Sequence, residues 1–338
     1  MGSKIKLSFF ISLFLFIIPL SACAVKTTHS VQTKLLMGTY VQIKVRNTGA
    51  SNAKIAIDKS FDEIERISKL MSRFSKDSEV YKINSLSPIQ FLKINPELYS
   101  LIETSIKYSR LTDGAFDITI FPLVQLWQSA FKKNQIPDKN KVKNISSLVN
   151  YQNIILKNNT IAFKKENMGI DLGGIAKGYA VDCAINKLQE CNIKEALVNA
   201  GGNIRVIGYK SWQIGLKHPR SNEILSRIEL KNKSTATSGD YERYFVKEGT
   251  RYHHILNPKT GYSADECISV TIIGDTGIIC DILSTAVFVL GPEKGMQIIE
   301  NTSGLDAIII DRDGNITISS GLKNKINLPK RIDTAVSS

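Results

Sequence analysis

Two short turns between apolar segments constrain the fold more than any other feature of this sequence. They are Asn158-Asn159 and Arg312-Asp313-Gly314. Each turn joins two short apolar segments, which gives the pairs 154–156 with 161–163 and 307–310 with 316–318. Asn, Asp and Gly tolerate the backbone conformations that tight hairpin turns need. The turns therefore predict antiparallel strand pairs and argue against a parallel doubly wound sheet.

Segments with helical periodicity lie between the predicted strands. Ser51 precedes apolar residues at helical spacing, Asn95-Pro96 begins a second helix, and Gly291-Pro292 ends a third at 277–290. Further helices are expected at 122–130 and 175–189, strands at 41–45, 196–198, 212–215, 228–230 and 268–273, and an exposed Lys- and Asn-rich segment at 131–143. This mixture predicts an α+β fold with mixed or antiparallel sheets and helices.

The first 25 residues predict an export signal. Lys4 and Lys6 precede an uncharged stretch whose apolar part, residues 7–20, is too short for a membrane span of about 20 residues. Leu20-Ser21-Ala22-Cys23 then resembles a bacterial lipobox. We expect cleavage before Cys23 and attachment of lipid to its thiol, and an ordinary signal peptide with a chance cysteine is the alternative.

This interpretation divides the chain and places it in the cell. We expect a lipoprotein signal peptide at 1–22, a tether at 23–34, one domain at 35–325 and a C-terminal tail at 326–338. The protein would be exported and lipid-anchored, on the periplasmic side of the inner or outer membrane or on the outer face of the cell membrane.

The net charge of +13 first suggests a nucleic acid or an anionic membrane as partner. Two of these charges lie in the predicted leader. A group of lysines at 132, 133, 139, 141 and 143 has no interleaved aromatic residues, so a solvated surface segment is favoured over a nucleic-acid site. We expect no nucleic acid among the partners.

Four cysteines follow Cys23, namely Cys183, Cys191, Cys267 and Cys280. Outside the cytoplasm they could form disulfides, with three complete pairings open, or remain buried thiols. The absence of a Cys-x-x-Cys pair argues against a zinc ribbon or a thioredoxin-type site.

The glycine-rich segment 171–179 is a candidate anion site. Its glycines open a predicted helix, where backbone N–H groups can approach a phosphate, and Lys177 adds a cation. The spacing matches neither the P-loop nor the dinucleotide fingerprint, and a tight strand-to-helix corner is the alternative. A second glycine turn at 199–203 follows a predicted strand directly.

Two further clusters could carry chemistry. Asp281 and Thr285 are four residues apart on a predicted helix, and hard oxygens on one face suit Mg²⁺, although an amphipathic helix with Asp near its start is the alternative. His253 and His254 point to opposite faces of a strand, so one of them could act as a general base while the other is structural.

The order of these motifs resembles the ApbE family of FAD:protein FMN transferases over residues 35–322. The motifs are Met-Gly-Thr (37–39), Asp-Gly-Ala-Phe-Asp (113–117), Asp-Leu-Gly-Gly-Ile-Ala-Lys-Gly-Tyr-Ala (171–180), Asn-Ala-Gly-Gly-Asn (199–203), Ala-Thr-Ser-Gly-Asp-Tyr (236–241), His-His-Ile (253–255) and Asp-x-x-Ser-Thr-Ala (281–286). The resemblance implies two lobes with a cleft between them. It also implies an enzyme that uses Mg²⁺, cleaves FAD, joins FMN through a phosphoester to a Thr or Ser of a target protein and releases AMP.

The resemblance also implies site residues. Metal ligands would be Asp281, Thr285, Ser284 and the carbonyl of Gly174, and catalytic roles fall to Asp281 and to His254 as proton acceptor. Contacts with FAD would come from Met37, Phe74, Ala115, Phe116, Asp117, Asp171, Lys177 and Ile255. The acceptors would be subunits of membrane redox complexes such as the Na⁺-translocating NADH:quinone reductase or Rnf. The alternatives are an FAD pyrophosphatase, which yields FMN and AMP, and a non-catalytic flavin-binding lipoprotein.

Overall fold

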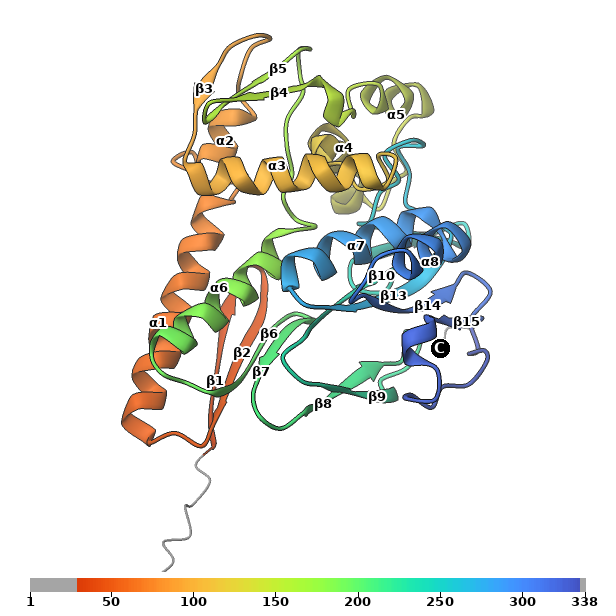
Figure 1. The fold of residues 1–338 in the computed structure, drawn as a ribbon. Coiled ribbons are helices and arrows are strands. Elements are labelled where there is room, and N and C mark those ends of the chain that lie inside the picture. The colour runs from red at the N-terminus through yellow and green to blue at the C-terminus, as the bar shows by residue number, and fades with distance from the viewer. Residues whose placement is uncertain (1–28, 335–338) are drawn as a thin grey trace, which may run out of the picture.

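The computed structural model describes residues 29–334, and an eight-stranded antiparallel sheet lies at its centre (Figure 1). The strands lie in the sheet in the same order as in the chain: β1 (His29–Leu36), β2 (Thr39–Arg46), β6 (Glu195–Ala200), β7 (Asn203–Ile207), β10 (Ser234–Gly239), β13 (Cys267–Gly274), β14 (Asp306–Asp311) and β15 (Ile316–Ile318). Alternation along each strand gives the sheet two apolar faces. Both faces are covered.

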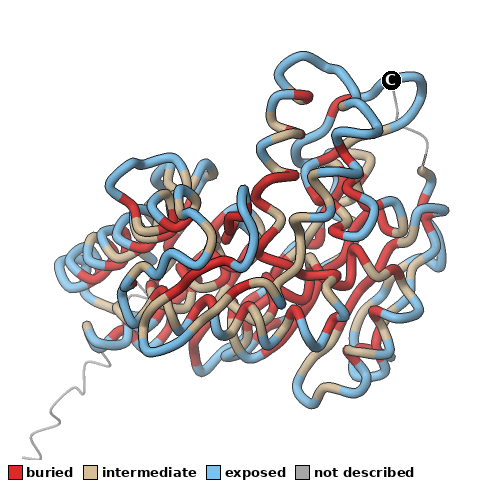
Figure 2. The backbone as a smooth tube through the Cα atoms, turned by 90° about the horizontal axis from the view of Figure 1, so that it is seen from above, coloured by how far each residue is buried: buried red, intermediate tan, exposed pale blue. Residues whose placement is uncertain are grey.

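Helices cover one face and a hairpin covers the other (Figure 1). The helices are α1 (Ala50–Leu70), α6 (Ala176–Glu190), α7 (Gly277–Leu290) and α8 (Pro292–Glu300), and the hairpin is β8 (Trp212–Lys217) with β9 (Ile224–Leu230). Val198 of β6 packs in the cluster under α1 and α6, whereas its neighbour Leu197 packs against Trp212 of β8. Figure 2 shows the buried residues running continuously through these layers.

The chain between α1 and α6 forms a further layer beyond the helices (Figure 1). Its elements are α2 (Glu79–Ile83), β3 (Leu92–Lys93), α3 (Pro96–Leu111), η1 (Ile118–Ile120), α4 (Phe121–Lys133), α5 (Lys139–Ser146), η2 (Tyr151–Asn153), β4 (Ile154–Lys157) and β5 (Thr160–Phe163). One apolar cluster joins this layer to α1, α6 and the sheet, and it includes Ile102, Phe163 and Val198.

A second hairpin connects the layers near α4. It consists of β11 (Tyr244–Lys247) and β12 (Thr250–His253). Elsewhere in the chain, a last short helix, η3 (Ser320–Leu322), follows β15. Trp127 of α4 stacks on Tyr252 with ring centroids 5.7 Å apart and donates a 2.7 Å hydrogen bond to the carbonyl of Gly261. The hairpin that carries the two adjacent histidines is thereby held against the outer layer.

Several predicted elements are confirmed. The α+β class is correct, and the helix expected at 277–290 is α7 with the same bounds. Asn158 and Asn159 both have positive φ, at 50° and 55°, as a two-residue hairpin turn requires. Asn95 caps α3 by accepting a hydrogen bond from the Glu97 N–H at 2.7 Å.

Two of the predicted boundaries differ from the secondary structure and packing of the chain. Residues 29–34, expected within the tether, form most of β1, because the polar alternation of an edge strand has the composition of a linker. Part of the expected tail is packed, since Ile332 is buried against Ile268 and Ile310. The segment 131–143 is largely exposed, as predicted, and it includes the end of α4 and the start of α5. The rest of the domain division stays a prediction.

The predicted signal peptide and Cys23 lie outside the described residues. Across residues 29–334, no helix is long and apolar enough to cross a membrane. The four cysteines in this range, Cys183, Cys191, Cys267 and Cys280, are all free thiols. Burial raises the pKa of the Cys267 thiol to about 12, which disfavours the reactive thiolate.

Candidate active site

The candidate site forms where α6 and α7 approach each other most closely. A Cβ on Gly178 would clash with the carbonyl of Gly277 and lie 2.7 Å from Cβ of Asp281. A Cβ on Gly277 would in turn lie 2.5 Å from the carbonyl of Gly178. Only glycine at both positions permits this approach, which places Asp281 beside the first turn of α6.

Asp281 is the centre of a buried polar cluster. Its side chain accepts a 2.8 Å hydrogen bond from the Gly178 N–H, and Lys177 Nζ lies 3.7 Å from the other carboxylate oxygen. Asn203, with its amide oriented so that both atoms are satisfied, donates to Asp281 and accepts from Lys177, both at 3.1 Å. Asp281 is only 3% exposed, and these partners compensate its buried charge.

A second carboxylate links the same two helices in the opposite direction. Asp182 of α6 accepts hydrogen bonds from the N–H groups of Gly277 and Ile278 at 2.8 and 3.0 Å, so it caps α7 from outside that helix. Arg205 forms an ion pair with Asp182 at 3.3 Å. Burial raises the pKa of Asp182, with a contribution from the negative charge of Asp281 nearby.

Hydroxyl groups lie one turn further along α7. Ser284 Oγ is 2.9 Å from Ser238 Oγ of β10, and both Ser284 and Thr285 bond the carbonyl of Asp281. A Cβ on Gly174 would lie 3.3 Å from Thr285 Oγ1, so the predicted metal-binding residues are neighbours in the fold. One carboxylate, hydroxyls and a carbonyl are all hard oxygen donors and fit Mg²⁺.

This set of possible metal ligands contains only one negatively charged group, the carboxylate of Asp281. Among residues 29–334, no group of three or more His, Cys, Asp or Glu side chains is placed to hold a metal ion. A metal at Asp281 would therefore depend on neutral oxygens and on the ligand's own phosphates, which is usual for Mg²⁺.

The rim of the site includes the turn between β1 and β2. Met37 and Gly38 both have positive φ, and a Cβ on Gly38 would lie 3.5 Å from a guanidinium nitrogen of Arg243. The backbone of Arg243 accepts a 3.1 Å hydrogen bond from the N–H of His254. Gly38 and His254, distant in sequence, are thus linked through Arg243.

The two histidines have different surroundings. His253 is buried, and its Nε2 is 2.7 Å from the carbonyl of Ala264, so its role is structural. His254 has exposed surface, yet dense protein around the ring reduces its hydration. This loss of hydration, followed by the charges of His253, Arg243 and Lys177, holds the pKa of His254 well below its usual value of 6.5.

Asp171 and Phe74 are brought together by Arg73. Arg73 forms a 2.7 Å ion pair with Asp171, and its guanidinium lies 4.4 Å from the ring centroid of Phe74. The Phe74 side chain is 71% exposed, which leaves one ring face free for stacking. Asp171 also accepts a 2.7 Å hydrogen bond from the Gly173 N–H and so shapes the glycine turn.

The remaining predicted flavin contacts are mostly buried. Phe116 packs against Gly174, and Ala115 and Ile255 belong to one apolar cluster. Asp117 is committed to the fold, because its carboxylate accepts hydrogen bonds from the backbone of Thr119 and of Tyr151, both at 2.8 Å. Burial raises its pKa despite these bonds.

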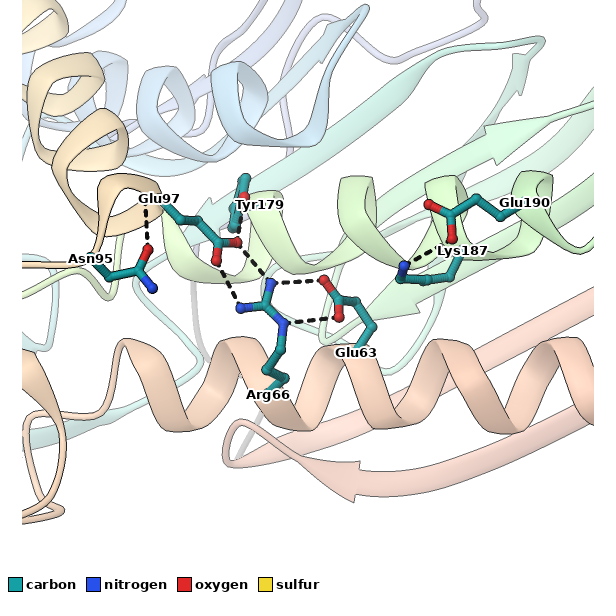
Figure 3. Close-up of polar contacts among 7 residues, drawn as sticks. All are labelled: Glu63, Arg66, Asn95, Glu97, Tyr179, Lys187 and Glu190. Atoms are coloured by element: carbon teal, nitrogen blue, oxygen red, sulfur yellow. Dashed lines mark hydrogen bonds and ion pairs between the residues drawn. The ribbon is translucent and has the colours of Figure 1, made fainter.

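Figure 3 shows a network of polar contacts that connects the first turn of α6 to α1 and α3. Arg66 of α1 binds the carboxylates of Glu63 and Glu97 with hydrogen bonds of 2.7–2.9 Å. Glu97 of α3 also accepts a 2.7 Å hydrogen bond from the hydroxyl of Tyr179. This network ties α1 and α3 to α6 two residues after Lys177.

Four residues of the site were missed by sequence reasoning: Arg73, Asp182, Asn203 and Arg243. Asn203 ends a glycine turn that the sequence did single out, and it is 2% exposed. The partners of Asp182 lie about 95 residues away in the chain, so no local pattern reveals them.

One cavity lies away from the residues around Asp281. Its volume is about 700 Å³, and its walls come from α4, α5 and the segment that connects them, including Leu126, Ile136 and Ile145. None of the predicted site residues lines it.

Comparison with known proteins gives a consistent result. The model of the ApbE family matches residues 37–309. An FAD:protein FMN transferase of Klebsiella pneumoniae (strain 342) is 33% identical over 291 residues, which cover 85% of this chain and 90% of that protein. One of Haemophilus influenzae is 31% identical and covers 92% and 95%.

Solved structures agree with these relatives. The ApbE protein of Thermotoga maritima superposes with a TM-score of 0.81 at 34% identity, covering 90% of this chain and all of that chain. The apo flavinyl transferase of Pseudomonas stutzeri gives a TM-score of 0.78 at 27% identity, with 88% and 97% covered.

Proposed function

Since this chain belongs to the ApbE family, we propose that it is an FAD:protein FMN transferase that uses the cluster around Asp281 to cleave FAD. The observation that carries the proposal is the contact of Asp281 with Lys177, Asn203 and the start of α6. Such a site combines a cation, backbone N–H groups and a carboxylate, as a diphosphate and its metal ion require.

The proposed reaction is a phosphoryl-type transfer. The hydroxyl oxygen of a Thr or Ser in the acceptor attacks the phosphorus of the FMN half, and a new P–O bond forms. The bond from that phosphorus to the bridging oxygen breaks, and AMP leaves with the electron pair. Charge neutralisation and in-line positioning dominate such reactions.

Lys177 neutralises phosphate charge at the start of α6, while Asp281 and Asn203 hold its ammonium group in place. Asp281, Thr285, Ser284 and the carbonyl of Gly174 would hold Mg²⁺. When bound, the ion supplies charge neutralisation and a template for the phosphates.

His254 takes the proton of the attacking hydroxyl. Its lowered pKa keeps the ring neutral at pH 7, so a ring nitrogen is free to accept a proton. Anionic phosphates near Lys177 and Arg243 would oppose the effect of these cations and raise the basicity of the ring in the complex.

The acceptor and the location follow from the same proposal. Acceptors would be exported subunits of membrane redox complexes of the Na⁺-translocating NADH:quinone reductase or Rnf type. A lipid on Cys23 would hold the enzyme on the outer side of a bacterial membrane, close to such subunits. Metabolic labelling with radioactive palmitate, compared between the natural chain and Cys23→Ala, tests the anchor.

The activity is tested with purified mature protein, FAD, Mg²⁺ and a candidate acceptor domain. We expect a fluorescent acceptor band that survives SDS and stoichiometric AMP. Asp281→Asn should lower the rate at least about 100-fold while FAD still binds. Asp313→Asn, which removes an exposed carboxylate remote from the site, is the matched control.

Two other outcomes would contradict the proposal. Release of free FMN and AMP at the same rate without acceptor would indicate an FAD pyrophosphatase. Binding of FAD without any AMP, whichever acceptor domain is supplied, would indicate a flavin-binding protein.

A further inference from the structure

Arg243 stands out among the arginines near the site because its charge is not compensated. Within residues 29–334, no carboxylate forms an ion pair with it, and its side chain is exposed. Its two neighbours differ, since Arg220 pairs with Asp240 at 2.7 Å and Arg251 approaches the same carboxylate at 3.9 Å. The fold thus neutralises two guanidinium groups of this region and leaves the third free.

The backbone of Arg243 is held by a hydrogen bond from His254, and its side chain reaches a neighbouring turn. It lies opposite His254, one residue beyond the register pair Tyr244 and His253, and its carbonyl accepts the His254 N–H. Its guanidinium reaches the turn at Gly38, where a Cβ would be 3.5 Å away. The guanidinium therefore lies between the strand that carries His254 and the turn between β1 and β2.

Two cations therefore face the place where the proposed proton acceptor lies. Lys177 and Arg243 come from α6 and from the β11 side of the hairpin, and both lower the pKa of His254 by their charge. Lys177 is partly neutralised by Asp281, whereas Arg243 is not. An anionic ligand between them would relieve the repulsion of the two charges.

We infer that Arg243 binds a phosphoryl oxygen of the nucleoside diphosphate substrate and stabilises the charge that develops there. This inference rests on the proposed function. Arginine suits the task because its planar group offers paired N–H donors to phosphate and stays charged at all relevant pH values. The turn at Gly38 offers open backbone on the same side, which a diphosphate can approach.

Equilibrium binding tests the inference without any turnover. The full mature chain is titrated with FAD, ADP and riboflavin, and the variants are Arg243→Gln, Arg243→Lys and the control Arg227→Gln, an exposed arginine on β9. We expect Arg243→Gln to weaken FAD and ADP about tenfold or more, since a hydrogen bond to a charged group is lost. Riboflavin, which has no phosphate, should bind equally to all variants.

The other results are equally informative. ADP affinity in Arg243→Gln equal to that in Arg227→Gln would overturn the inference, as would an equal loss for riboflavin, which indicates a structural role. Arg243→Lys should keep part of the affinity because the charge remains. A natural chain that binds FAD and ADP but never labels an acceptor would refute the proposed function and leave the assignment of Arg243 standing.

Discussion

Asp182 and Asp281 each cap the helix that carries the other. Asp182 of α6 accepts from the first N–H groups of α7, and Asp281 of α7 accepts from Gly178 in the first turn of α6. The two carboxylates therefore fix how the first turn of α6 lies against the first turn of α7, because each helix donates N–H groups to the other. Any change at one cap is expected to move the other.

Replacing Asp182 tests this coupling. Asp182→Asn replaces an acceptor by an NH₂ group that faces the α7 N–H donors, so the unfolding free energy should fall by about 1–3 kcal/mol. Urea unfolding measures the change. Glu190→Gln, on the exposed end of the same helix, is the control and should unfold like the natural chain. Equal curves for the two variants would show that the cap contributes nothing.

Gly178 permits the approach of the helices, and Gly178→Ala should separate them. Alanine normally stabilises a helix relative to glycine, but here its Cβ meets the backbone of Gly277. We expect a loss of about 1–3 kcal/mol in stability and a larger proportional loss of transfer rate, because Asp281 shifts. Gly49→Ala, where no atom lies within 4 Å of the new Cβ, should be harmless. A stable, fully active Gly178→Ala variant would contradict the close approach.

Buried His253 predicts a pH dependence of stability. Burial lowers its pKa below 6.5, so the unfolded chain binds a proton more readily than the folded one. Stability is therefore full above pH 6.5 and decreases as the pH falls toward the lowered pKa, by up to about 1.4 kcal/mol per pH unit for this one group. His253→Gln should reduce that slope between pH 7 and pH 5. An unchanged slope in denaturation curves would exclude His253 as its source.

The pair of Arg220 and Asp240 is almost completely withdrawn from water, with side chains 9% and 10% exposed. Removing one partner leaves a buried charge without compensation, and Asp240→Asn should cost about 3–5 kcal/mol. The exposed pair of Lys54 and Asp58 is the control, and Asp58→Asn should change little. Calorimetry compares the two variants, and similar melting temperatures would argue against burial of the Arg220 pair.

Local patterns predicted local structure well. The bounds of α7 follow from an apolar run that ends at Gly291-Pro292, and the turn at Asn158 follows from residues that tolerate positive φ. Strand β1 was missed because an exposed edge strand alternates polar side chains as a tether does. The sequence within a few residues was enough to predict α7 and the turn at Asn158, but it could not distinguish β1 from a tether.

From the residues alone, without the family resemblance, proximity of two side chains could be predicted only within one segment. Asp281 and Thr285 share a helix turn, so their proximity could be inferred, whereas Asn203 reaches Asp281 only because β7 lies beside α7 in the fold. Asp117 was predicted to contact FAD, and the packing adds that its carboxylate also accepts hydrogen bonds from Thr119 and Tyr151. A motif identifies a residue, but only the packing shows whether its side chain is free.

The order of strands in the central sheet has a consequence for how the molecule can be assembled. Each strand of this sheet after β1 lies beside the strand of the same sheet that precedes it in the chain. No strand has to enter between two that are already paired, so the sheet can grow from one edge while the chain is still being made. Three segments are inserted between successive strands of the sheet: the outer layer, the β8–β9 hairpin and the β11–β12 hairpin. Each can fold separately without changing the order in which the sheet strands pair.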